Sequence, residues 1–322
     1  MLLPVCWLLT QFEASAAGPA LSLLTNYPLP GVKGRLGHLA LDSSRRLLYV
    51  PACDGGSVEV LDLSTGRRVR QMQVDTPRRL VVLSRPNLLY VTCGRDGQVK
   101  VLDCAAGRAI KTIGPLPQAD ALWLDAPANR VYVGYDSALA MLNAQTGVHT
   151  VTTPLAGHPA AIVIEPTGQR LFVNVPAAGH VAVIERLTRE VVATWALPPE
   201  EAGEALALDG AHGRLFVACN RPAQLTVLDT ASGKPVATVP VAGDIGTLCY
   251  DATRRRLYGL SGEGVVEVLE QTDPDHYAPQ VRLATARGAR TGLFDGESGR
   301  LFVAVPAVGG RAAEVRVYAA GP

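Results

Sequence analysis

The sequence predicts an all-β protein, a seven-bladed β-propeller made of four-stranded antiparallel blades. Three observations lead to this prediction. One strand pattern recurs seven times, its copies are spaced by about 42 residues, and the last copy ends one strand short of a complete unit. A period of roughly 40–45 residues is typical of a propeller blade, so the repeat length and the strand pattern indicate the same architecture.

The composition agrees with such a fold and excludes several classes of function. Of the 322 residues, 48% are hydrophobic and 18% are charged, which excludes disorder of the highly charged kind. The 32 glycines and 23 prolines favour many short strands with frequent turns. A net charge of +1 removes the electrostatic argument for a nucleic-acid-binding protein or a polybasic membrane-surface protein. No apolar stretch reaches the ~20 residues of a transmembrane helix, so no transmembrane segment is predicted.

The most regular part of the repeat is a strand with the pattern Leu or Val, aromatic, and in most copies Val. The aromatic residues of the seven copies are Tyr49, Tyr90, Tyr132, Phe172, Phe216, Tyr258 and Phe302. Short apolar runs of this kind, bounded by turn residues, are consistent with fully buried strands.

Three further strands complete each period. An alternating segment follows the aromatic strand, and its first copy is residues 57–62 (SVEVLD), a pattern typical of a strand with one buried face. A turn that contains Gly then leads to a more variable outer strand, such as residues 68–74. A segment of small apolar residues ending in Asp or Glu comes last, as in residues 38–42 (HLALD), and suits the crowded inner strand around a central channel.

The two ends of the chain provide an independent check. The last copy stops after its third strand, at residues 318–319, and residues 21–30 read like an outer strand placed before the first inner strand. We expect this N-terminal strand to close the last blade, which leaves few unprotected edges. An open β-solenoid would instead need capping repeats. The sequence thus predicts a single propeller domain over residues 20–320.

One copy of the repeat also resembles a known family. Tyr90-Val91-Thr92 is followed by Cys93, where the YVTN repeat has Asn, and residues 97–103 match the G-x-V-x-V-x-D element. On these residues the chain resembles the YVTN-type β-propeller repeat proteins of bacteria and archaea, over residues 20–320. The resemblance implies the fold and an exported protein. It implies no particular chemistry, since the same fold also hosts lactonases, lyases and oxidoreductases.

The N-terminus predicts export. Residues 1–12 are mostly apolar, and Ala14-Ser15-Ala16 matches the small-x-small cleavage pattern of a secretory signal, although no basic residue precedes Lys33. Residues 1–17 are therefore predicted to be a signal peptide of a periplasmic or secreted protein. A misplaced start or an ordinary apolar arm are the alternatives. Five cysteines would remain, an odd number with no C-x-x-C pair, so we expect buried or half-buried thiols.

Candidate site residues gather on one predicted face. In a propeller, the loops that enter the inner strands share a face with the loops between the second and third strands, and we call it the top face. Segments from different blades would bring polar side chains to a central funnel, a concave site of the kind that binds ligands. The candidate ligand-binding residues are Arg35, His38, Arg79, Asp120, His158, Glu204, Asp244 and Arg290. Alternatively, some of these groups only solvate the channel.

Motifs for specific chemistry are absent. There is no G-x-x-x-x-G-K-[ST] phosphate loop and no G-x-S-x-G nucleophile elbow, so no cofactor is predicted and no catalytic residue is assigned. His38 and His158 are the best metal-ligand candidates, with Asp120, Glu204 and Asp244 as oxygen partners, but their spacing is not diagnostic and metal binding stays open. Residues 271–279, which include His276, read as an exposed loop that could contact a partner.

Two functions follow from these observations. The first is a non-enzymatic, exported binding or interaction protein, monomeric, whose funnel holds a polar or anionic small molecule, a glycan or a loop of another protein. Arginines in the funnel favour such a ligand because they form bidentate hydrogen bonds. The alternative is a metal-assisted lactonase or lyase at the same funnel. Docking of a separate electron-transfer protein is a further possibility.

Overall fold

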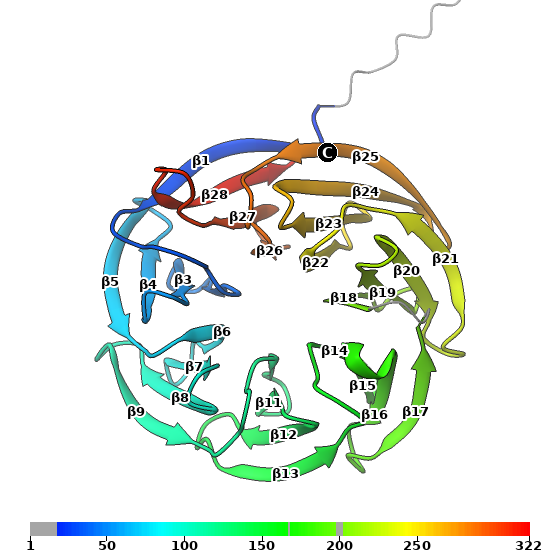
Figure 1. Cartoon of the computed structure of the whole chain (residues 1–322), viewed down its shortest axis with the longest axis horizontal. Coiled ribbons are helices and arrows are strands. Elements are labelled where there is room, and N and C mark those ends of the chain that lie inside the picture. Colours follow the sequence, from blue (N-terminus) through cyan, green and yellow to red (C-terminus); the bar gives the residue numbers. More distant parts are fainter. Residues whose placement is uncertain (1–17, 167, 198–201) are drawn as a thin grey trace, which may run out of the picture.

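A computed structural model describes residues 18–166, 168–197 and 202–322 of the chain. The described strands form seven separate four-stranded antiparallel sheets, which surround a central axis as the blades of a propeller (Figure 1). The fold class predicted from the repeat is therefore confirmed. The predicted signal peptide, residues 1–17, lies outside the described residues.

Each of the first six blades is built from four consecutive strands, numbered from the inside outward. Blade 1 contains β2 (Ala40–Asp42), β3 (Leu47–Ala52), β4 (Ser57–Asp62) and β5 (Arg67–Gln73). Blade 2 contains β6 (Pro77–Leu83), β7 (Leu88–Cys93), β8 (Gln98–Asp103) and β9 (Arg108–Ile113). Blade 3 contains β10 (Leu122–Asp125), β11 (Arg130–Tyr135), β12 (Ala138–Asn143) and β13 (His149–Pro154).

The remaining blades follow the same order, apart from the last. Blade 4 contains β14 (Ala161–Ile164), β15 (Arg170–Val175), β16 (His180–Glu185) and β17 (Val191–Ala196), with a short 3-10 turn, η1 (Pro176–Ala178). Blade 5 contains β18 (Ala202–Asp209), β19 (Arg214–Cys219), β20 (Gln224–Asp229) and β21 (Pro235–Pro240). Blade 6 contains β22 (Ile245–Asp251), β23 (Arg256–Ser261), β24 (Val265–Asp273) and β25 (His276–Ala284). Blade 7 contains β26 (Thr291–Asp295), β27 (Arg300–Val305), β28 (Ala313–Ala320) and β1 (Leu21–Leu29).

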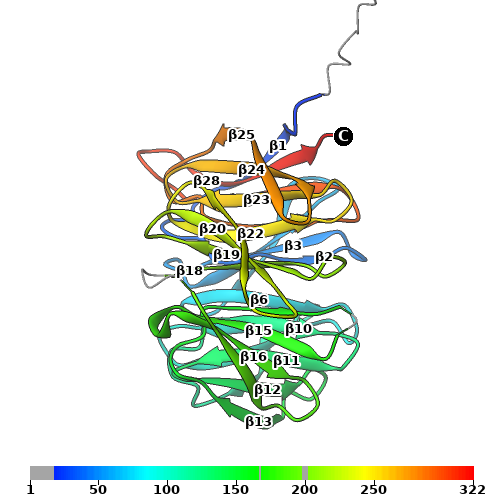
Figure 2. The ribbon, with the colours of Figure 1, turned by 90° about the vertical axis from the view of Figure 1, so that its right-hand side faces the viewer.

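The ring is closed by the first strand of the chain. Strand β1 pairs antiparallel with β28, from Leu21 opposite Ala320 to Leu29 opposite Ala313. Figure 1 shows β1 on the circumference beside β28, and Figure 2 shows the same arrangement with the ring edge-on. The hydroxyl group of Thr291 also donates a hydrogen bond to the carbonyl oxygen of Leu36, which joins the last blade to the first. The predicted closure is thus observed, and it removes the exposed edge that β28 would otherwise present.

The core lies between blades rather than in one central mass. Each pair of neighbouring blades buries one cluster of apolar side chains, and each cluster combines strands of both blades. The repeated aromatic residues lie in these clusters and are at most 3% exposed. Since burial removes so much apolar area from water, truncating one of these rings to Ala should cost about 3–5 kcal/mol.

On the face opposite the top face, which we call the bottom face, the turns after the inner strands are held by the carboxylates that end these strands. The Oδ1 atom of Asp42 accepts hydrogen bonds from the hydroxyl of Ser44 and from the backbone N–H of Arg45, which fixes the turn after β2. Its Oδ1 atom also accepts a hydrogen bond from Ser84 of the next blade. The repeated carboxylate therefore both caps a turn and joins neighbouring blades, which agrees with a structural role for this face.

Two segments differ from the sequence prediction. Residues 271–279 form a long hairpin of β24 and β25 and not a loop, although Thr272, Asp273, His276 and Pro279 are exposed as expected. Gln271 is buried: its amide donates a hydrogen bond to Asp209 of blade 5, and its carbonyl oxygen accepts one from Tyr250. In blade 2, the inner strand (PRRLVVL) ends in Leu83 instead of an acidic residue, so its sequence does not match the pattern of the other inner strands.

Candidate functional site

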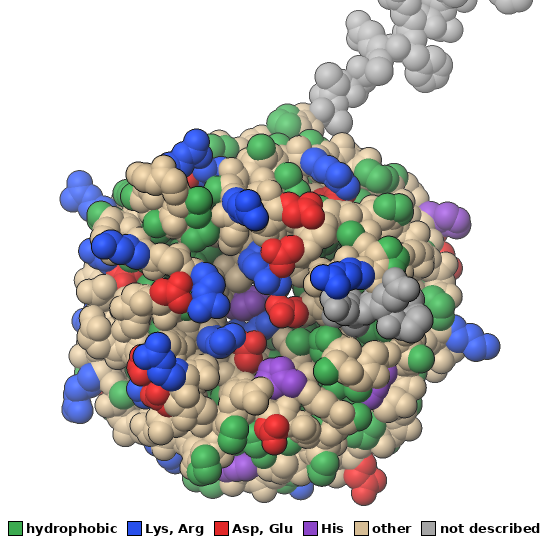
Figure 3. Space-filling model, in the orientation of Figure 1, with side chains coloured by type: hydrophobic (Ala, Val, Ile, Leu, Met, Phe, Trp, Pro, Cys, Tyr) green, Lys and Arg blue, Asp and Glu red, His purple; other side chains and the backbone are tan. Residues whose placement is uncertain are grey.

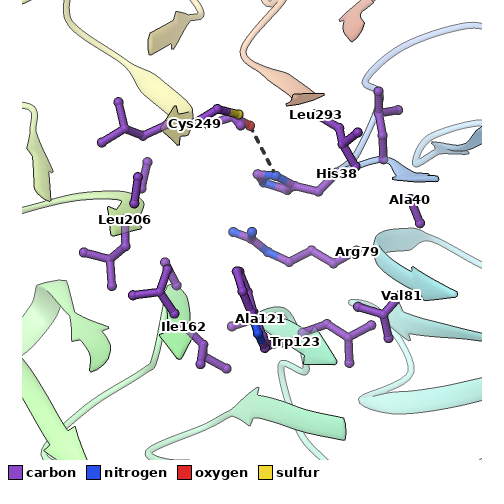
Figure 4. A pocket seen from close by; sticks show the side chains of 18 of the residues that line it. His38, Ala40, Arg79, Val81, Ala121, Trp123, Ile162, Leu206, Cys249 and Leu293 are labelled. Carbon is purple, nitrogen blue, oxygen red and sulfur yellow. Dashed lines mark hydrogen bonds between the residues drawn. The ribbon is translucent and has the colours of Figure 1, made fainter. Parts of the chain in front are cut away.

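A channel follows the axis of the ring and encloses a cavity of about 600 Å³. The inner strands of all seven blades line it, mainly with apolar side chains. Figure 4 shows several of them, including Trp123, Ile162, Leu206 and Leu293, around the opening. The channel is thus an apolar tube, and its chemistry depends on the polar side chains at one end.

The polar end lies on the face turned to the viewer in Figure 3. Acidic, basic and histidine side chains gather around the central opening of this face. Of the eight residues predicted for the site, His38, Arg79 and Glu204 line the cavity. Ion pairs connect Asp120 to Arg79, and connect Asp244 and Glu204 to Arg290. We call these six residues together with Arg78 the mouth.

His38 and Arg79 occupy a position where the other blades carry small side chains. Both residues point toward the channel centre in Figure 4. At the equivalent place in the five-residue inner segments, the other blades have Ala121, Ala161, Ala205, Thr247 and Thr291. A β-bridge between His38 and Arg79 holds the first two blades together at this point, and the N–H of His38 donates to the carbonyl oxygen of Arg78, 2.9 Å away.

The environment of His38 keeps its imidazole neutral near pH 7. Burial lowers the pKa of His38 well below its usual value, and the nearby guanidinium groups of Arg79 and Arg290 lower it further. Its Nδ1 atom lies 3.3 Å from the hydroxyl oxygen of Thr247, in blade 6. The imidazole is therefore available as a hydrogen-bonding group, not as a cation.

Arg79 extends from blade 2 to blade 4 across the mouth. Its Nη2 atom donates a hydrogen bond to the carbonyl oxygen of Ala160, 3.0 Å away, and its side chain is only 15% exposed. Its Nε atom lies 3.6 Å from Oδ1 of Asp120, and makes no hydrogen bond. Arg78 lies on the same carboxylate, with 3.9 Å between Nη1 and Oδ2. Two guanidinium groups thus share one carboxylate at longer than hydrogen-bond distance.

In blades 5 to 7 the ratio of charges is reversed, with Arg290 placed between two carboxylates. Its Nη2 atom lies 2.9 Å from Oε2 of Glu204, and its Nη1 atom lies 3.0 Å from Oδ1 of Asp244. Gly246 leaves room for this side chain, because a Cβ atom there would overlap Nε and the carbonyl oxygen of Arg290. Two carboxylates therefore share one guanidinium group, at short distances.

The remaining two predicted residues have other partners. Arg35 forms an exposed ion pair with Asp54, with 2.9 Å between Nη2 and Oδ1, and its backbone N–H donates to the same carboxylate. His158 contacts the carbonyl oxygen of Asp136 through Nδ1, at 3.1 Å. Neither side chain lines the cavity. Sequence position alone placed them on the top face but did not indicate these local partners.

The channel also contains residues that the sequence reasoning missed. Trp123 lines the cavity and is 37% exposed, and Cys249 and Tyr250 line it from blade 6. The sequence does contain these residues at the third and fourth positions of the inner segments. Because most side chains of the inner segments are small and apolar, the few large side chains at these positions were not considered as channel residues.

The candidate metal ligands are not grouped together, and the thiols are free. In the parts of the chain that the structure describes, no three His, Cys, Asp or Glu side chains are grouped so that they could hold a metal ion. The candidate pair His38 and His158 instead have the separate partners given above. Cys93 and Cys219 are buried, and Cys53, Cys104 and Cys249 are half-buried, all as free thiols. Across the described ranges, no helix has the length and hydropathy needed to span a membrane.

The fold and the mouth define a seven-bladed β-propeller with an apolar channel that opens between charged side chains. No protein-family model matches the sequence, and no curated protein matches it. Among solved structures, the hydrazine synthase of Kuenenia stuttgartiensis matches with a TM-score of 0.76 at 16% sequence identity. The match covers 89% of this chain and 98% of that chain. At this identity the similarity supports the propeller fold alone.

Proposed function

We propose that this protein is an exported, YVTN-type binding propeller that holds a polar or charged small molecule, or a loop of a partner, at the mouth. The repeat residues around Tyr90 and Gly97 support the family assignment. The apolar N-terminal segment and the Ala14-Ser15-Ala16 pattern support export. N-terminal sequencing of the mature protein tests export, and an intact N-terminus in the cytoplasmic fraction would contradict it.

One observation carries the binding function. His38 and Arg79 place large polar side chains at positions where five other blades have Ala or Thr. Those five blades pack into the ring with small side chains at this position, so the fold does not require a large or charged side chain there. A cavity of about 600 Å³ with a few converging polar groups lies within the usual size of small-molecule sites. Recognition of a ligand explains why only two blades depart from the repeated pattern.

The ion pairs favour binding over the alternative, a metal-assisted lactonase or lyase. A divalent cation would need the carboxylates of Glu204 and Asp244, and both already contact Arg290. A cation at this place would meet the repulsion of that guanidinium group. Turnover of lactones that depends on added metal ions and disappears in His38→Ala and His158→Ala would overturn the non-enzymatic proposal.

A thermal-shift screen against a broad panel of metabolites tests the binding function. A ligand that binds only the folded state raises the apparent stability, so at least one class of compound should raise the melting temperature of the wild type. The shift should disappear in His38→Ala and Arg79→Ala. It should persist in Arg108→Gln, a variant of an exposed residue on the outer strand β9. Shifts that are equal in all variants would place the ligand elsewhere.

A further inference from the structure

We infer that the ligand of the mouth is a small zwitterion with an apolar body: an anionic group on the side of Arg79, an ammonium group on the side of Glu204, and an uncharged apolar part inside the channel. This inference rests on the proposed binding function and specifies the chemical class of its ligand. Three observations carry it: the separation of charge across the mouth, the unequal pairing on its two sides, and the apolar walls below.

The charges of the mouth are separated, although they sum to zero. Arg78 and Arg79 together with Asp120 carry two positive charges and one negative charge, a net +1. Glu204 and Asp244 together with Arg290 carry two negative charges and one positive charge, a net −1. The first group lies at blades 2 to 4, because the Arg79 side chain extends from β6 to the carbonyl oxygen of Ala160. The second group lies at blades 5 to 7. Strands β6 and β18 themselves lie on opposite sides of the axis (Figure 1).

Two neighbouring groups leave this separation unchanged. His38 lies between the two groups and is neutral near pH 7, since burial and the two arginines lower its pKa. The neighbouring pair of Arg35 and Asp54 is neutral as a unit. A purely anionic ligand would be attracted by Arg79 but repelled by Glu204. A purely cationic ligand would be attracted by Glu204 but repelled by Arg79. A zwitterion is attracted on both sides.

Each side offers the kind of contact that its charge requires. Among the described residues, the one carboxylate that pairs with Arg79 is that of Asp120, 3.6 Å away. The charge of Arg79 is therefore compensated less than that of Arg290, whose two ion pairs measure 2.9 and 3.0 Å. The side chain of Glu204 is 56% exposed, and only its Oε2 atom contacts Arg290. A carboxylate or similar anion can therefore approach Arg79, and an ammonium group can approach Glu204.

The channel below the mouth selects for an apolar body. Arg79 and Glu204 are the two charged side chains that line the cavity within the described residues, while Ile162, Leu206 and Trp123 contribute apolar surface. Trp123, 37% exposed, presents its ring to the channel (Figure 4). Burial of apolar ligand surface here is favourable because it removes that surface from water. Zwitterions without an apolar part lack this contribution.

Isothermal titration calorimetry with a matched set of dipeptides tests the inference. The probes are leucyl-leucine, its N-acetyl derivative, its C-terminal amide, and glycyl-glycine. We expect leucyl-leucine to bind the wild type, and each of the other three to bind at least about tenfold more weakly, since a 1.4 kcal/mol loss is a factor of ten. Equal affinity for the parent dipeptide and either capped derivative would overturn the zwitterion, as would absence of measurable dipeptide binding.

Charge-removing variants assign each end of the probe. Glu204→Gln should lower the affinity for leucyl-leucine without further lowering the affinity for its N-acetyl derivative. Arg79→Gln should lower the affinity for leucyl-leucine without further lowering the affinity for its C-terminal amide. Arg79→Lys, which retains the charge, should preserve discrimination against the amide even if the bond to Ala160 is lost. Arg108→Gln and Glu190→Gln, at exposed positions away from the mouth, are the matched controls. Equal losses for all probes would contradict the assignment.

The metabolite screen separates the two possible failures. Suppose that the dipeptides do not bind, but simple anions in the screen stabilise the wild type and not Arg79→Ala. The zwitterion is then wrong and the binding function stands. If no compound in the screen depends on His38 or Arg79, the binding function itself fails.

Discussion

The Nη2 atom of Arg79 donates a hydrogen bond to the carbonyl oxygen of Ala160, so a side chain of blade 2 is anchored on blade 4. Blade 3 lies between them in the ring. This bond positions the guanidinium group over the channel in one extended conformation (Figure 4). A long side chain held in this way loses less freedom when a ligand binds, which favours affinity.

Arg79→Ala and Arg290→Ala should differ in their effect on stability. Arg79 is 15% exposed and its loss removes a bond to a backbone carbonyl, so we expect a decrease of about 1–2 kcal/mol in the free energy of unfolding. Arg290 is 32% exposed, and loss of its ion pairs should cost less than about 1 kcal/mol. Urea unfolding measures both. Both variants should impair ligand binding more than folding, and parallel losses of binding and stability would contradict a binding role.

His38 should make the wild type lose stability in mild acid. Its folded-state pKa is lowered below 6.5, so the unfolded state binds a proton that the folded state excludes. The contribution of His38 to stability is therefore fully present above pH 6.5, and is lost as the pH falls toward the folded-state pKa. The slope should approach about 1.4 kcal/mol per pH unit.

Comparison with His38→Gln isolates this effect. Urea unfolding at pH 7.5, 6.5, 5.5 and 5.0 should show the wild type falling relative to the variant below pH 6.5. The lowered carboxyl pKa values of groups such as Asp42 do not interfere, since those carboxylates stay ionised throughout this range. A constant difference between the two proteins from pH 7.5 to 5.0 would show that His38 titrates normally.

Gly37→Ala should disturb the contact between blades 1 and 2. A Cβ atom at this position would overlap the carbonyl oxygen of Arg78, which accepts the hydrogen bond from His38. Overpacking of this kind typically costs about 1–3 kcal/mol, and the displaced backbone carries His38 away from its place at the mouth. We expect a lower melting temperature by circular dichroism and weaker ligand binding. Gly55→Ala is the control, because its Cβ would meet only ordinary contacts, the nearest at 3.4 Å.

Deletion of residues 1–29 should open the ring. Without β1, strand β28 becomes an unpaired edge whose buried residues Val315, Val317 and Tyr318 are exposed. Such an edge is a template for pairing with other chains, so size-exclusion chromatography should show oligomers and aggregates. A synthetic peptide of residues 21–29, added in trans, should restore the elution volume of the full-length protein by β-strand addition. If the deletion variant without the peptide elutes like the full-length protein, closure by β1 contributes little to the assembly state.

The repeat predicted the fold because the same burial requirement acts seven times. Every blade packs against two similar neighbours, so each aromatic strand carries the same residue types at the same position. Tyr49 and Phe302, for example, are both buried aromatic residues at equivalent positions. The repeat did not predict the long hairpin of β24 and β25. Its extra residues have no counterpart in other blades, and the contact of Gln271 with Asp209 depends on an adjacent blade.

The site was predictable only in part. The repeat located the polar side chains on the top face, and six of the eight candidates lie in the mouth. Which charges pair could not be predicted, because Arg290 lies beside Glu204 and Asp244 through the curvature of the ring and not through sequence spacing. Arg35 pairs instead with Asp54, and this pairing depends on the local conformation of the two loops.

The pairing of β1 with β28 also has a consequence for biosynthesis. Blades 1 to 6 are each continuous in sequence, so each can form soon after its own segment leaves the ribosome. Strand β1 leaves first, yet its partner is synthesised last. The nine residues of β1 must therefore wait, unpaired, through nearly the whole of translation, and the ring is completed only when the final strand emerges.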